Sequence, residues 1–405
     1  MHIGDSPDEA AYRETAAAWL GAHATLKAAA PASDGNAHPD LATHIQRCRE
    51  WQRTLYTGGW AGITWPKAFG GQGGSPIESA VFAEEQARYD VSVGAFAVAI
   101  GMVGPTLIAH GTDQQRERFL DPMLRADHVW CQLFSEPGAG SDLASLATRA
   151  EPDGSGGWIV NGQKVWTSFA QFSDYGILLA RTNPDVPKRK GLTYFVVDMT
   201  SPGIEIRPLR QITGIAHFNE VFLSDVHIPA ENVIGSVDDG WTIAQTTLLS
   251  ERALIGGGLS AWTVGELVDL ARAARATDDP IMRDELARAH CREATLKYLG
   301  HRLRTAMSER RIPGPEMLVM KLALARHYTA TTDAAMRILG AGGTLADDPN
   351  AGGTNWRYHF LNHFAVRLGG GTDEVQANII AERGLGLPRD PADDPTLPWK
   401  DLVRS

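Results

Sequence analysis

The order of hydrophobic patterns along the sequence is the strongest constraint on its fold. Residues 8 to 125 carry apolar side chains at helical spacing, residues 128 to 235 alternate like short strands between turn signals, and helical spacing returns from Gly240 to about Arg383. Strands grouped between two helical regions are unlike the strand–helix alternation of a doubly wound sheet. The sequence therefore predicts an α+β chain with a compact antiparallel β unit at its centre.

These patterns define three expected domains. An N-terminal α-helical domain is expected at 1–127, a central β domain at 128–237 and a C-terminal helical domain at 238–405. The strands of the β domain are expected at Val129–Phe134, Trp158–Val160, Gly176–Arg181, Leu192–Asp198, Ile204–Pro208 and Asn219–Phe222. The helices of the last domain are expected at Trp241–Leu259, Trp262–Ala274, Pro280–Glu309, Pro315–Leu339 and Thr372–Arg383.

Length and charge narrow the class of protein. A chain of 405 residues is too long for one simple core, which favours two or three packed units. Hydrophobic residues at 43% and charged residues at 21% are ordinary for a soluble globular protein. The formal net charge is -10 and no cluster of lysines and arginines stands out, so nucleic-acid binding is not expected.

The cysteines and the N-terminal residues indicate in which cellular compartment the protein is expected. Cys48, Cys131 and Cys291 lie far apart and show no Cys-x-x-Cys or Cys/His spacing, so neither a metal site nor a disulfide framework is expected. The segment Met1–Asp8 lacks a basic region followed by an apolar run, and no apolar run is long enough to span a bilayer. We therefore expect a cytoplasmic protein.

A short stretch of small and polar residues opens the β region. Phe134–Asp142 reads Phe-Ser-Glu-Pro-Gly-Ala-Gly-Ser-Asp, with Gly138 and Gly140 two residues apart. Small residues let backbone N–H groups face a ligand without an intervening side chain. The spacing is not Gly-x-Gly-x-x-Gly and no long Val/Ile-rich strand precedes it, so a Rossmann site is not indicated. Taken alone, the stretch also fits a surface turn.

A second stretch follows within the same region. Asn161–Ser168 reads Asn-Gly-Gln-Lys-Val-Trp-Thr-Ser. The Asn-Gly pair predicts a hairpin turn, and the two-residue spacing predicts that Trp166 and Ser168 share one face of a strand. Trp166 alone fits a core aromatic side chain equally well.

Together the two stretches resemble the acyl-CoA dehydrogenase family of flavoproteins. The family pattern is Ser/Thr-Glu-x-x-x-Gly-Ser-Asp, followed some two dozen residues later by Asn-Gly-x-Lys-x-Trp-x-Thr/Ser, and both halves occur here. The resemblance extends over nearly the whole chain. It implies an α-helical domain, a central β domain and a C-terminal four-helix bundle, with FAD as cofactor.

The resemblance also implies which side chains surround the flavin. Carried over by position, Trp166 flanks the isoalloxazine ring and the Ser168 hydroxyl bonds near its N5 atom, while Ser141 lies near the flavin phosphates and the pantetheine arm of the substrate. A flat conjugated ring needs aromatic and small neighbours and fixed hydrogen-bond donors, so these residue types suit the role. The ring is further lined, on this reading, by Gln132, Phe134 and Ser135.

A third signature lies near the C-terminus. Gly371–Ile380 resembles the family's Glu-Gly-Thr/Ser-x-x-x-Gln helix start, with Thr372 as the N-cap. Asp373 and Glu374 suit the positive end of the helix, and Thr372 and Glu374 match family positions near the flavin. The glutamate that precedes the glycine in the family, its commonest base, is replaced by Gly370.

Glu251 can replace the missing base. Its neighbours at helical spacing, Ala244, Leu248, Ile255 and Leu259, are all apolar, which places Glu251 on the buried stripe of its helix. A buried carboxylate costs several kcal/mol, on the order expected for a buried charge, unless it is paired or its pKa is raised. On pattern alone, Glu251 can also lean to the helix edge or pair with a basic residue. In the long-chain and isovaleryl branches of the family, the base sits at this Glu-Arg position, and Arg252 follows it here.

Other family positions have changed. The Gln-x-x-Gly-Gly segment, by which a neighbouring subunit contacts FAD, reads Arg337-Ile338-Leu339-Gly340-Ala341. The Arg-x-x-Phe-Gly segment is not recognisable, and Arg272 or Arg275 is the candidate replacement for its arginine. These changes leave room for an unlike partner subunit. The family buries its C-terminal bundle against a second subunit, so a homo- or hetero-oligomeric dimer or tetramer is expected.

The resemblance predicts an FAD-dependent acyl-CoA dehydrogenase. Glu251 removes the α-proton of the acyl thioester while flavin N5 takes the β-hydride, the Gly370 N–H helps to polarise the thioester carbonyl, and an electron-transfer flavoprotein accepts the electrons. Two alternatives remain open. One is an FAD- or acyl-CoA-binding partner subunit of a hetero-oligomeric dehydrogenase, and the other is a related flavoprotein that uses oxygen. Fatty, branched and steroid acyl chains all remain open.

Overall fold

The computed structural model describes residues 4–27, 40–257, 262–309, 315–345, 354–388 and 396–402. The chain divides into two compact units. The helical unit comprises Met1–His38, Ser75–Val91 and Arg252–Pro388, and the sheet unit comprises Pro39–Gly74, Ser92–Glu251 and Arg389–Ser405. Each unit therefore draws on segments that are distant in sequence.

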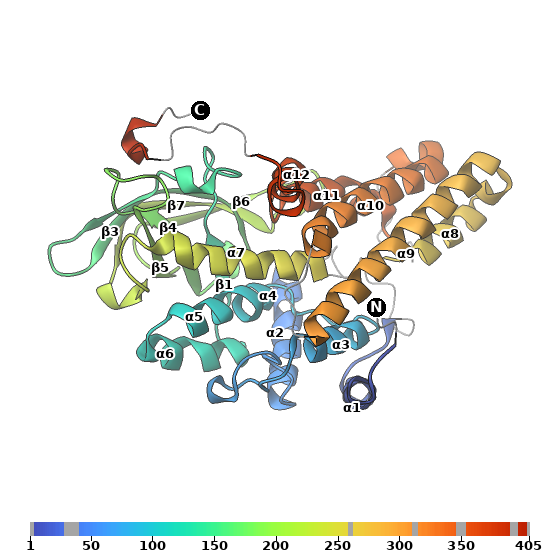
Figure 1. Cartoon of the computed structure of the whole chain (residues 1–405), viewed down its shortest axis with the longest axis horizontal. Helices are drawn as coiled ribbons and strands as arrows, with labels where there is room; N and C mark the ends of the chain where they lie inside the picture. The colour runs from blue at the N-terminus through green and yellow to red at the C-terminus, as the bar shows by residue number, and fades with distance from the viewer. Residues whose placement is uncertain are drawn as a thin grey trace. The chain divides into compact units, whose positions relative to one another are not determined.

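The sheet unit is built on one eight-stranded sheet (Figure 1). Its strand order is β6-β7-β3-β2-β4-β5-β8, and β1 pairs with β4 off this path. The strands are β1 Trp130–Leu133, β2 Arg149–Pro152, β3 Trp158–Ser168, β4 Tyr175–Arg181, β5 Leu192–Asp198, β6 Ile204–Leu209, β7 Phe218–Ile228 and β8 Val233–Ile234. The helices of this unit are α2 Leu41–Thr57, α4 Phe96–Val98, α5 Gly104–His110, α6 Asp113–Leu124 and the greater part of α7 Gly240–Gly257.

The predicted α+β architecture is confirmed, but the sheet is mixed. The pairs β3·β7, β4·β5 and β6·β7 are antiparallel, whereas β1 runs parallel to β4 with Gln132 opposite Ile177. Alternation of apolar and polar residues reveals a strand without revealing the direction of its neighbour, so the purely antiparallel expectation was wrong on this point.

The predicted hairpin turn at Asn161-Gly162 was also wrong. Both residues lie inside β3, which continues unbroken to Ser168. A Cβ atom on Gly162 would lie 2.4 Å from the Thr148 hydroxyl oxygen. Gly162 therefore permits a close approach of two backbones within the sheet, a second common role of glycine in strands.

The sheet core is apolar and dense. Residues Leu192 to Val197 of β5 are all buried, as are residues Gly176 to Arg181 of β4. Leu133, Phe195 and Val221 belong to one buried hydrophobic cluster that joins β1, β5 and β7. Fully buried central strands give the residues at their ends fixed positions.

The helical unit includes a bundle formed by α8, α9, α10 and α11 (Figure 1). Trp262 and Trp356 pack with Tyr328 in its core, where Trp262 lies 5.2 Å from Tyr328 and 5.3 Å from Trp356 between ring centroids. This arrangement agrees with the predicted C-terminal bundle. The helices of the unit are α1 Pro7–His23, α3 Pro76–Gln86, α8 Val264–Ala273, α9 Pro280–Ser308, α10 Pro315–Leu339, α11 Trp356–Leu368 and α12 Asp373–Ile379.

Two arginines connect α1, α3 and α9 within the helical unit. Arg13 pairs with Asp5 at 2.6 Å and with Glu84 at 2.6 Å, and Arg304 pairs with Glu9 at 2.9 Å. The hydrogen bond from Arg13, outweighing the opposing effect of burial, helps to lower the pKa of Asp5 to about 2. The N-terminal helix therefore packs against α3 and is joined to α9 of the bundle by a network of charges.

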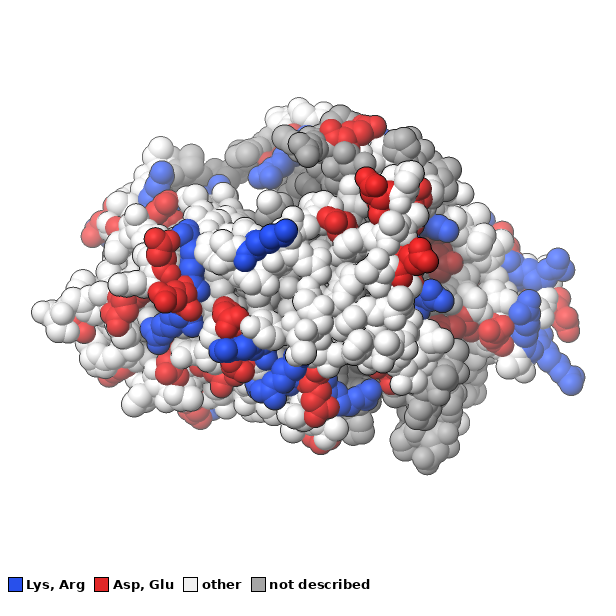
Figure 2. Space-filling view, turned by 90° about the horizontal axis from the view of Figure 1, so that it is seen from below, with Lys and Arg blue, Asp and Glu red and all other residues white. Residues whose placement is uncertain are grey.

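The surface carries charges of both signs. On the face shown in Figure 2, side chains of Lys and Arg are interspersed with those of Asp and Glu. Among the described residues, no group of three or more His, Cys, Asp and Glu side chains could hold a metal ion. No described helix is both long and apolar enough to cross a membrane.

Candidate active site

The loop Phe134–Asp142 follows β1 directly, and no other atoms crowd its backbone at the two glycines. Glu136 and Ala139 close a tight turn through backbone hydrogen bonds of 3.2 and 3.0 Å, and the Val165 N–H of β3 donates to the Ser135 carbonyl at 2.9 Å. A Cβ atom on Gly138 or Gly140 would meet no atom within 4 Å. The loop is therefore held at its base by β3 and presents unobstructed backbone at its tip, as the sequence indicated.

Lys164 of β3 joins the two sequence motifs in the core. Its side chain is 0% exposed, and its ammonium donates to the Phe134 carbonyl at 3.0 Å, to the Glu136 carboxylate at 2.8 Å and to the Leu179 carbonyl at 2.8 Å. An ammonium group has three N–H donors, and each finds an acceptor here. Burial lowers the pKa of Lys164, and the Glu136 carboxylate opposes that effect.

Glu136 completes this buried pair. Besides Lys164, its carboxylate accepts the N–H groups of Ala147 at 2.6 Å and Thr148 at 2.9 Å. Burial alone would oppose its ionisation, but Lys164 and these hydrogen bonds lower the pKa of Glu136 below its ordinary value. The carboxylate therefore ties the loop to β3 and to the segment directly before β2. Sequence reasoning assigned no role to this pair, although both residues belong to the motifs that it singled out.

Trp166 occupies a bulge in β3. Lys164 lies opposite Val221 and Thr167 lies opposite Asn219, so β3 has one extra residue between them. Trp166 has a φ of 60°, which is rare for a bulky residue and costs about 1–3 kcal/mol. Its side chain is 60% exposed, against 0% for Thr167. The strained backbone therefore presents a large aromatic ring at the surface of the sheet unit, and the core interpretation of Trp166 is wrong.

The surroundings of Trp166 suit a flat ring. Phe218 packs against Trp166 edge to face, with 6.0 Å between ring centroids, and lies opposite Ser168 in the register of β3 and β7. Ser168 is half-buried. Together with the open backbone at Gly138 and Gly140, this exposed aromatic side chain and nearby hydroxyl group fit the requirements of a bound flavin.

Glu251 lies beside Gln132. The Gln132 amide donates to the Glu251 carboxylate at 3.3 Å, across 119 positions of sequence. Glu251 is half-buried near the end of α7, while Ala244, two turns earlier, is 0% exposed. Ile255 and Leu259, which helped to define the predicted apolar stripe, have no described side chains. The structure thus brings the predicted base and a predicted flavin-lining residue together.

The glycine-rich loop before α12 belongs to the helical unit. Gly370 and Gly371 have φ values of 65° and 92°, in the left-handed region that favours glycine. Lys321 of α10 donates to the Gly371 carbonyl at 2.6 Å, and Gln376 donates to the Gly370 carbonyl at 2.9 Å. Thr372 caps α12, as predicted, by accepting the Val375 N–H at 3.2 Å. The loop is therefore held rigidly by its carbonyl groups.

The remaining predicted residues are placed in several ways. Arg337 forms an ion pair with Glu285, so its guanidinium is engaged within the helical unit. Gly340 has a φ of 54° directly after α10, and Ser141 is exposed. Glu374 is fully exposed in the first turn of α12, where hydrogen bonds from its own backbone N–H and from Thr372 lower its pKa. The side chain of Arg252 lies outside the described residues.

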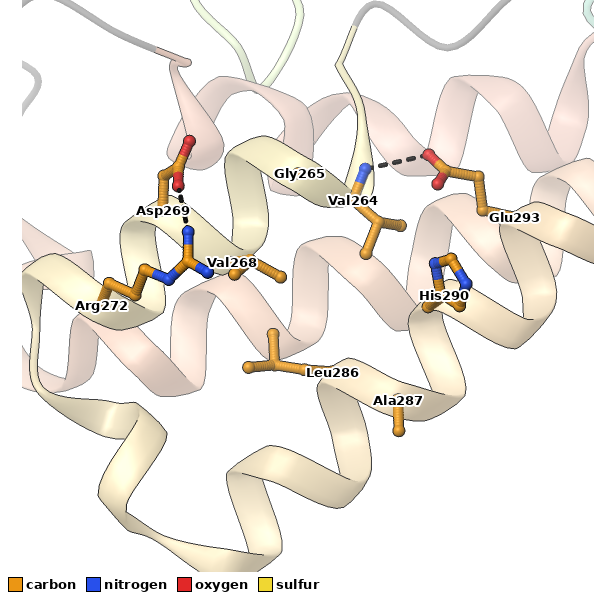
Figure 3. Close-up of a pocket in the computed structure, with 9 residues that line it drawn as sticks. All are labelled: Val264, Gly265, Val268, Asp269, Arg272, Leu286, Ala287, His290 and Glu293. Atoms are coloured by element: carbon orange, nitrogen blue, oxygen red, sulfur yellow. Dashed lines mark hydrogen bonds and ion pairs between the residues drawn. The ribbon is translucent and has the colours of Figure 1, made fainter.

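A groove between α8 and α9 contains Arg272, a candidate replacement for the family's arginine (Figure 3). Arg272 pairs with Asp269 of its own helix at 3.2 Å. Farther along the groove, the Glu293 carboxylate accepts the Val264 N–H at 2.9 Å and so satisfies a donor in the first turn of α8. The groove is lined by Val264, Gly265, Val268, Asp269, Arg272, Leu286, Ala287, His290 and Glu293.

Comparison with protein families matches almost the entire chain. The N-terminal domain of acyl-CoA dehydrogenase matches residues 6–127, its middle domain residues 131–226 and its C-terminal domain residues 238–385. Among curated relatives, acyl-CoA dehydrogenase IpdE1 of Mycobacterium tuberculosis is 40% identical over 351 residues, which cover 84% of this chain and 88% of IpdE1. Acyl-CoA dehydrogenase FadE34 of the same organism is 42% identical over 331 residues.

The match to FadE34 covers very different shares of the two proteins. It covers 80% of this chain but only 44% of FadE34, so the chain spans less than half the length of that relative.

Two solved structures are similar over most of the chain. The Tcur3481-Tcur3483 steroid ACAD has a TM-score of 0.81 at 28% identity, covering 96% of this chain and 100% of that one. The ChsE4-ChsE5 complex of Mycobacterium tuberculosis has a TM-score of 0.77 at 28% identity, with the same coverage.

Proposed function

Because this chain belongs to the acyl-CoA dehydrogenase family, we propose that it oxidises an acyl-CoA thioester to the trans-2-enoyl-CoA with Glu251 as the base. FAD is the cofactor of this family. The observation that carries the proposal is the hydrogen bond between Gln132 and Glu251, because it joins the proposed base to a residue expected to line the flavin. A carboxylate at this position can act as a general base if it lies within hydrogen-bond reach of the α-proton.

In this proposed reaction, each residue of the site has a separate role. Glu251 takes the α-proton, and the Gly370 N–H donates to the thioester carbonyl, whose oxygen gains negative charge as the proton leaves. Trp166 flanks the flavin ring, and the Ser135 and Ser168 side chains supply polar contacts at its edge. Bound FAD supplies the hydride acceptor at its N5 atom.

The substrate proposal draws on the relatives. The Tcur3481-Tcur3483 structure is named a steroid ACAD, so we place a steroid side-chain thioester first among the candidate substrates. Straight-chain and branched fatty acyl thioesters come next. An electron-transfer flavoprotein is the proposed acceptor of the electrons, by analogy with the family.

We further propose that the chain functions in a dimer or a tetramer, which is either homo-oligomeric or hetero-oligomeric. The two similar structures, Tcur3481-Tcur3483 and ChsE4-ChsE5, are each named for two components, which supports an unlike partner. In the helical unit, α11 exposes Phe364 at 48% and Leu368 at 65%, and Leu385 and Leu387 are exposed at 70% and 53%. Such side chains mark an interface where they form one contiguous patch. An FAD-saturated monomer in sedimentation would contradict this proposal.

The chain can alternatively serve as the non-catalytic partner of such a complex. Gly370 in place of the family's glutamate and the internal pairing of Arg337 with Glu285 favour this second candidate. The two functions differ in one measurement. Only a catalytic chain reduces its own flavin when acyl-CoA is added, whereas a partner subunit reduces none without the other chain.

The proposed function predicts a yellow protein that releases FAD on denaturation. The test is anaerobic bleaching of the flavin absorbance by butyryl-CoA, octanoyl-CoA, isovaleryl-CoA and cholyl-CoA, with the chain alone and together with any chain that co-purifies. A colourless protein that takes up no added FAD would rule out the cofactor assignment. Rapid oxygen consumption after bleaching would instead indicate an oxygen-using flavoprotein.

Trp166→Ala should weaken FAD retention about 10-fold or more, because a flanking aromatic ring is lost. The free energy of unfolding should change little, since the Trp166 side chain is 60% exposed. Equilibrium dialysis against FAD and thermal unfolding measure the two effects separately. Equal FAD affinity in parent and variant would remove Trp166 from the site.

A further inference from the structure

Gln132 is an unusual residue for its strand. The other three residues of β1, Trp130, Cys131 and Leu133, are each 0% exposed, whereas Gln132 is half-buried. Its backbone is fixed by parallel pairing with Ile177 of β4, a strand buried along nearly all its length. The half-buried amide of Gln132 has a protein partner, because it donates to the Glu251 carboxylate at 3.3 Å. The amide is therefore presented to the carboxylate from a rigid element.

The helix that carries Glu251 is fixed one turn earlier. The Thr247 hydroxyl lies 2.9 Å from the Thr106 hydroxyl of α5 and 2.9 Å from the Tyr194 hydroxyl of β5. All three side chains are 0% exposed. Residues four apart lie on the same face of a helix, so this buried group of hydroxyls sets the rotation of α7 at the position that directs Glu251.

The same group of hydroxyls reaches the loop at the flavin site. The Tyr194 ring packs edge to face against Phe134, with 5.7 Å between centroids. Phe134 is 3% exposed and lies two residues after Gln132. The helix bearing the base, the strand bearing the amide and the start of the loop are thus held in one packed arrangement within the sheet unit.

We propose that Gln132 is a positioning residue that orients the Glu251 carboxylate for proton abstraction. The inference rests on the proposed function, in which Glu251 is the base. A neutral amide cannot take the proton, but its N–H holds one carboxylate oxygen and so restricts rotation of the group. Proton transfer depends steeply on such orientation, because the accepting oxygen must lie within hydrogen-bond reach of the proton.

The test is a double-mutant cycle on flavin reduction. Gln132→Met keeps an unbranched side chain of similar length and removes the donor. Its rate of flavin reduction at saturating acyl-CoA should fall by about 10–100-fold. The acyl-CoA concentration for half-maximal rate should stay near that of the parent, and the rate is measured on FAD-saturated protein, so that weaker flavin binding by the Gln132 variant does not enter the comparison. In the Glu251→Gln background, Gln132→Met should cause no further loss, because its effect acts through the carboxylate.

Gln163 offers a matched control. Its amide donates to Glu220 at 2.9 Å in the same sheet. Gln163→Met therefore removes the same kind of hydrogen bond and should reduce its flavin at the parent rate. The experiment uses the holoenzyme and, as substrate, the acyl-CoA of the four that bleaches it fastest.

The outcomes separate this inference from the proposed function. A parent-like rate in Glu251→Gln would overturn the assignment of the base and, with it, the role of Gln132. A slow Glu251→Gln variant with a parent-like Gln132→Met variant would overturn only the positioning role. Equal losses from Gln132→Met in both backgrounds would also overturn it, as would a loss explained entirely by missing FAD.

Discussion

Replacement of Glu251 by glutamine should slow flavin reduction by acyl-CoA by about 10²–10⁴-fold, the range typical of losing a general base. Glutamine keeps the size and hydrogen-bonding capacity of the side chain and removes its basicity. Since Gln132 can still approach residue 251, FAD content and the melting temperature should stay near those of the parent. Stopped-flow absorbance of the flavin under anaerobic conditions measures the rate, and the spectrum of the purified protein gives the FAD content.

A second variant, in which the carboxylate is moved from position 251 to position 370, tests the same assignment. The double variant Glu251→Gly with Gly370→Glu moves the carboxylate to the position at which the family most commonly carries its base. It should recover part of the activity with an altered preference for the acyl chain. Recovery should be partial because Gly370 has a φ of 65°, and a residue with a Cβ atom pays about 1–2 kcal/mol for that conformation.

A parent-like rate of flavin reduction in the Glu251→Gln variant would contradict the assignment of the base. If Glu251→Gln bleaches as fast as the parent, the carboxylate is structural and the base lies elsewhere. Glu374 or a partner chain would then be tested next. Glu374 is weakened as a base by the lowered pKa that its position at the start of α12 gives it.

Lys164→Met should lower the free energy of unfolding by about 3–5 kcal/mol, the usual cost of breaking a buried ion pair on one side. The variant leaves the Glu136 carboxylate buried without its cation and leaves two carbonyl groups without their donor. Because the hydrogen bonds from Lys164 to Glu136 and to the Phe134 carbonyl fix the loop at the proposed flavin site, FAD should also be retained less well. Chemical unfolding and FAD content measure the two effects.

Lys188 provides the control for this change. Lys188 pairs with Asp142 at 2.6 Å, but the two side chains are 28% and 57% exposed. An exposed pair contributes roughly 0–1 kcal/mol, so Lys188→Met should unfold almost like the parent. A loss in Lys164→Met no larger than in Lys188→Met would show that the buried pair does not stabilise the fold.

The cost of Lys164→Met should depend on pH. In the parent, the lowered pKa of Glu136 stabilises the folded state above about pH 4.5, and this contribution is lost as the pH falls through the folded-state pKa. In the variant, protonation of Glu136 relieves the burial of an unpaired charge. The difference in free energy of unfolding between parent and variant should therefore be smaller at pH 4.5 than at pH 7. An equal difference at both pH values would argue against ionised Glu136.

The sequence by itself determined the order of the elements and the residues that carry the family resemblance. The continuous apolar runs of β4 and β5 and the N-cap at Thr372 are local signals, because propensity, periodicity and capping act within a few residues. Each of the two motifs assigned to the proposed flavin site is likewise one continuous stretch of sequence. Each could be recognised before any contact between them was known.

Only the tertiary structure decided how these pieces meet. Lys164 reaches Glu136 across 28 positions and Gln132 reaches Glu251 across 119, and no local pattern encodes contacts over such distances. The parallel pairing of β1 with β4, the place of Gly162 inside β3 and the exposed, strained Trp166 also depend on neighbours from other parts of the chain. The residue types indicated the chemistry proposed for the site. Packing within the sheet unit determined the hydrogen-bond partners, the exposure and the orientation of those side chains.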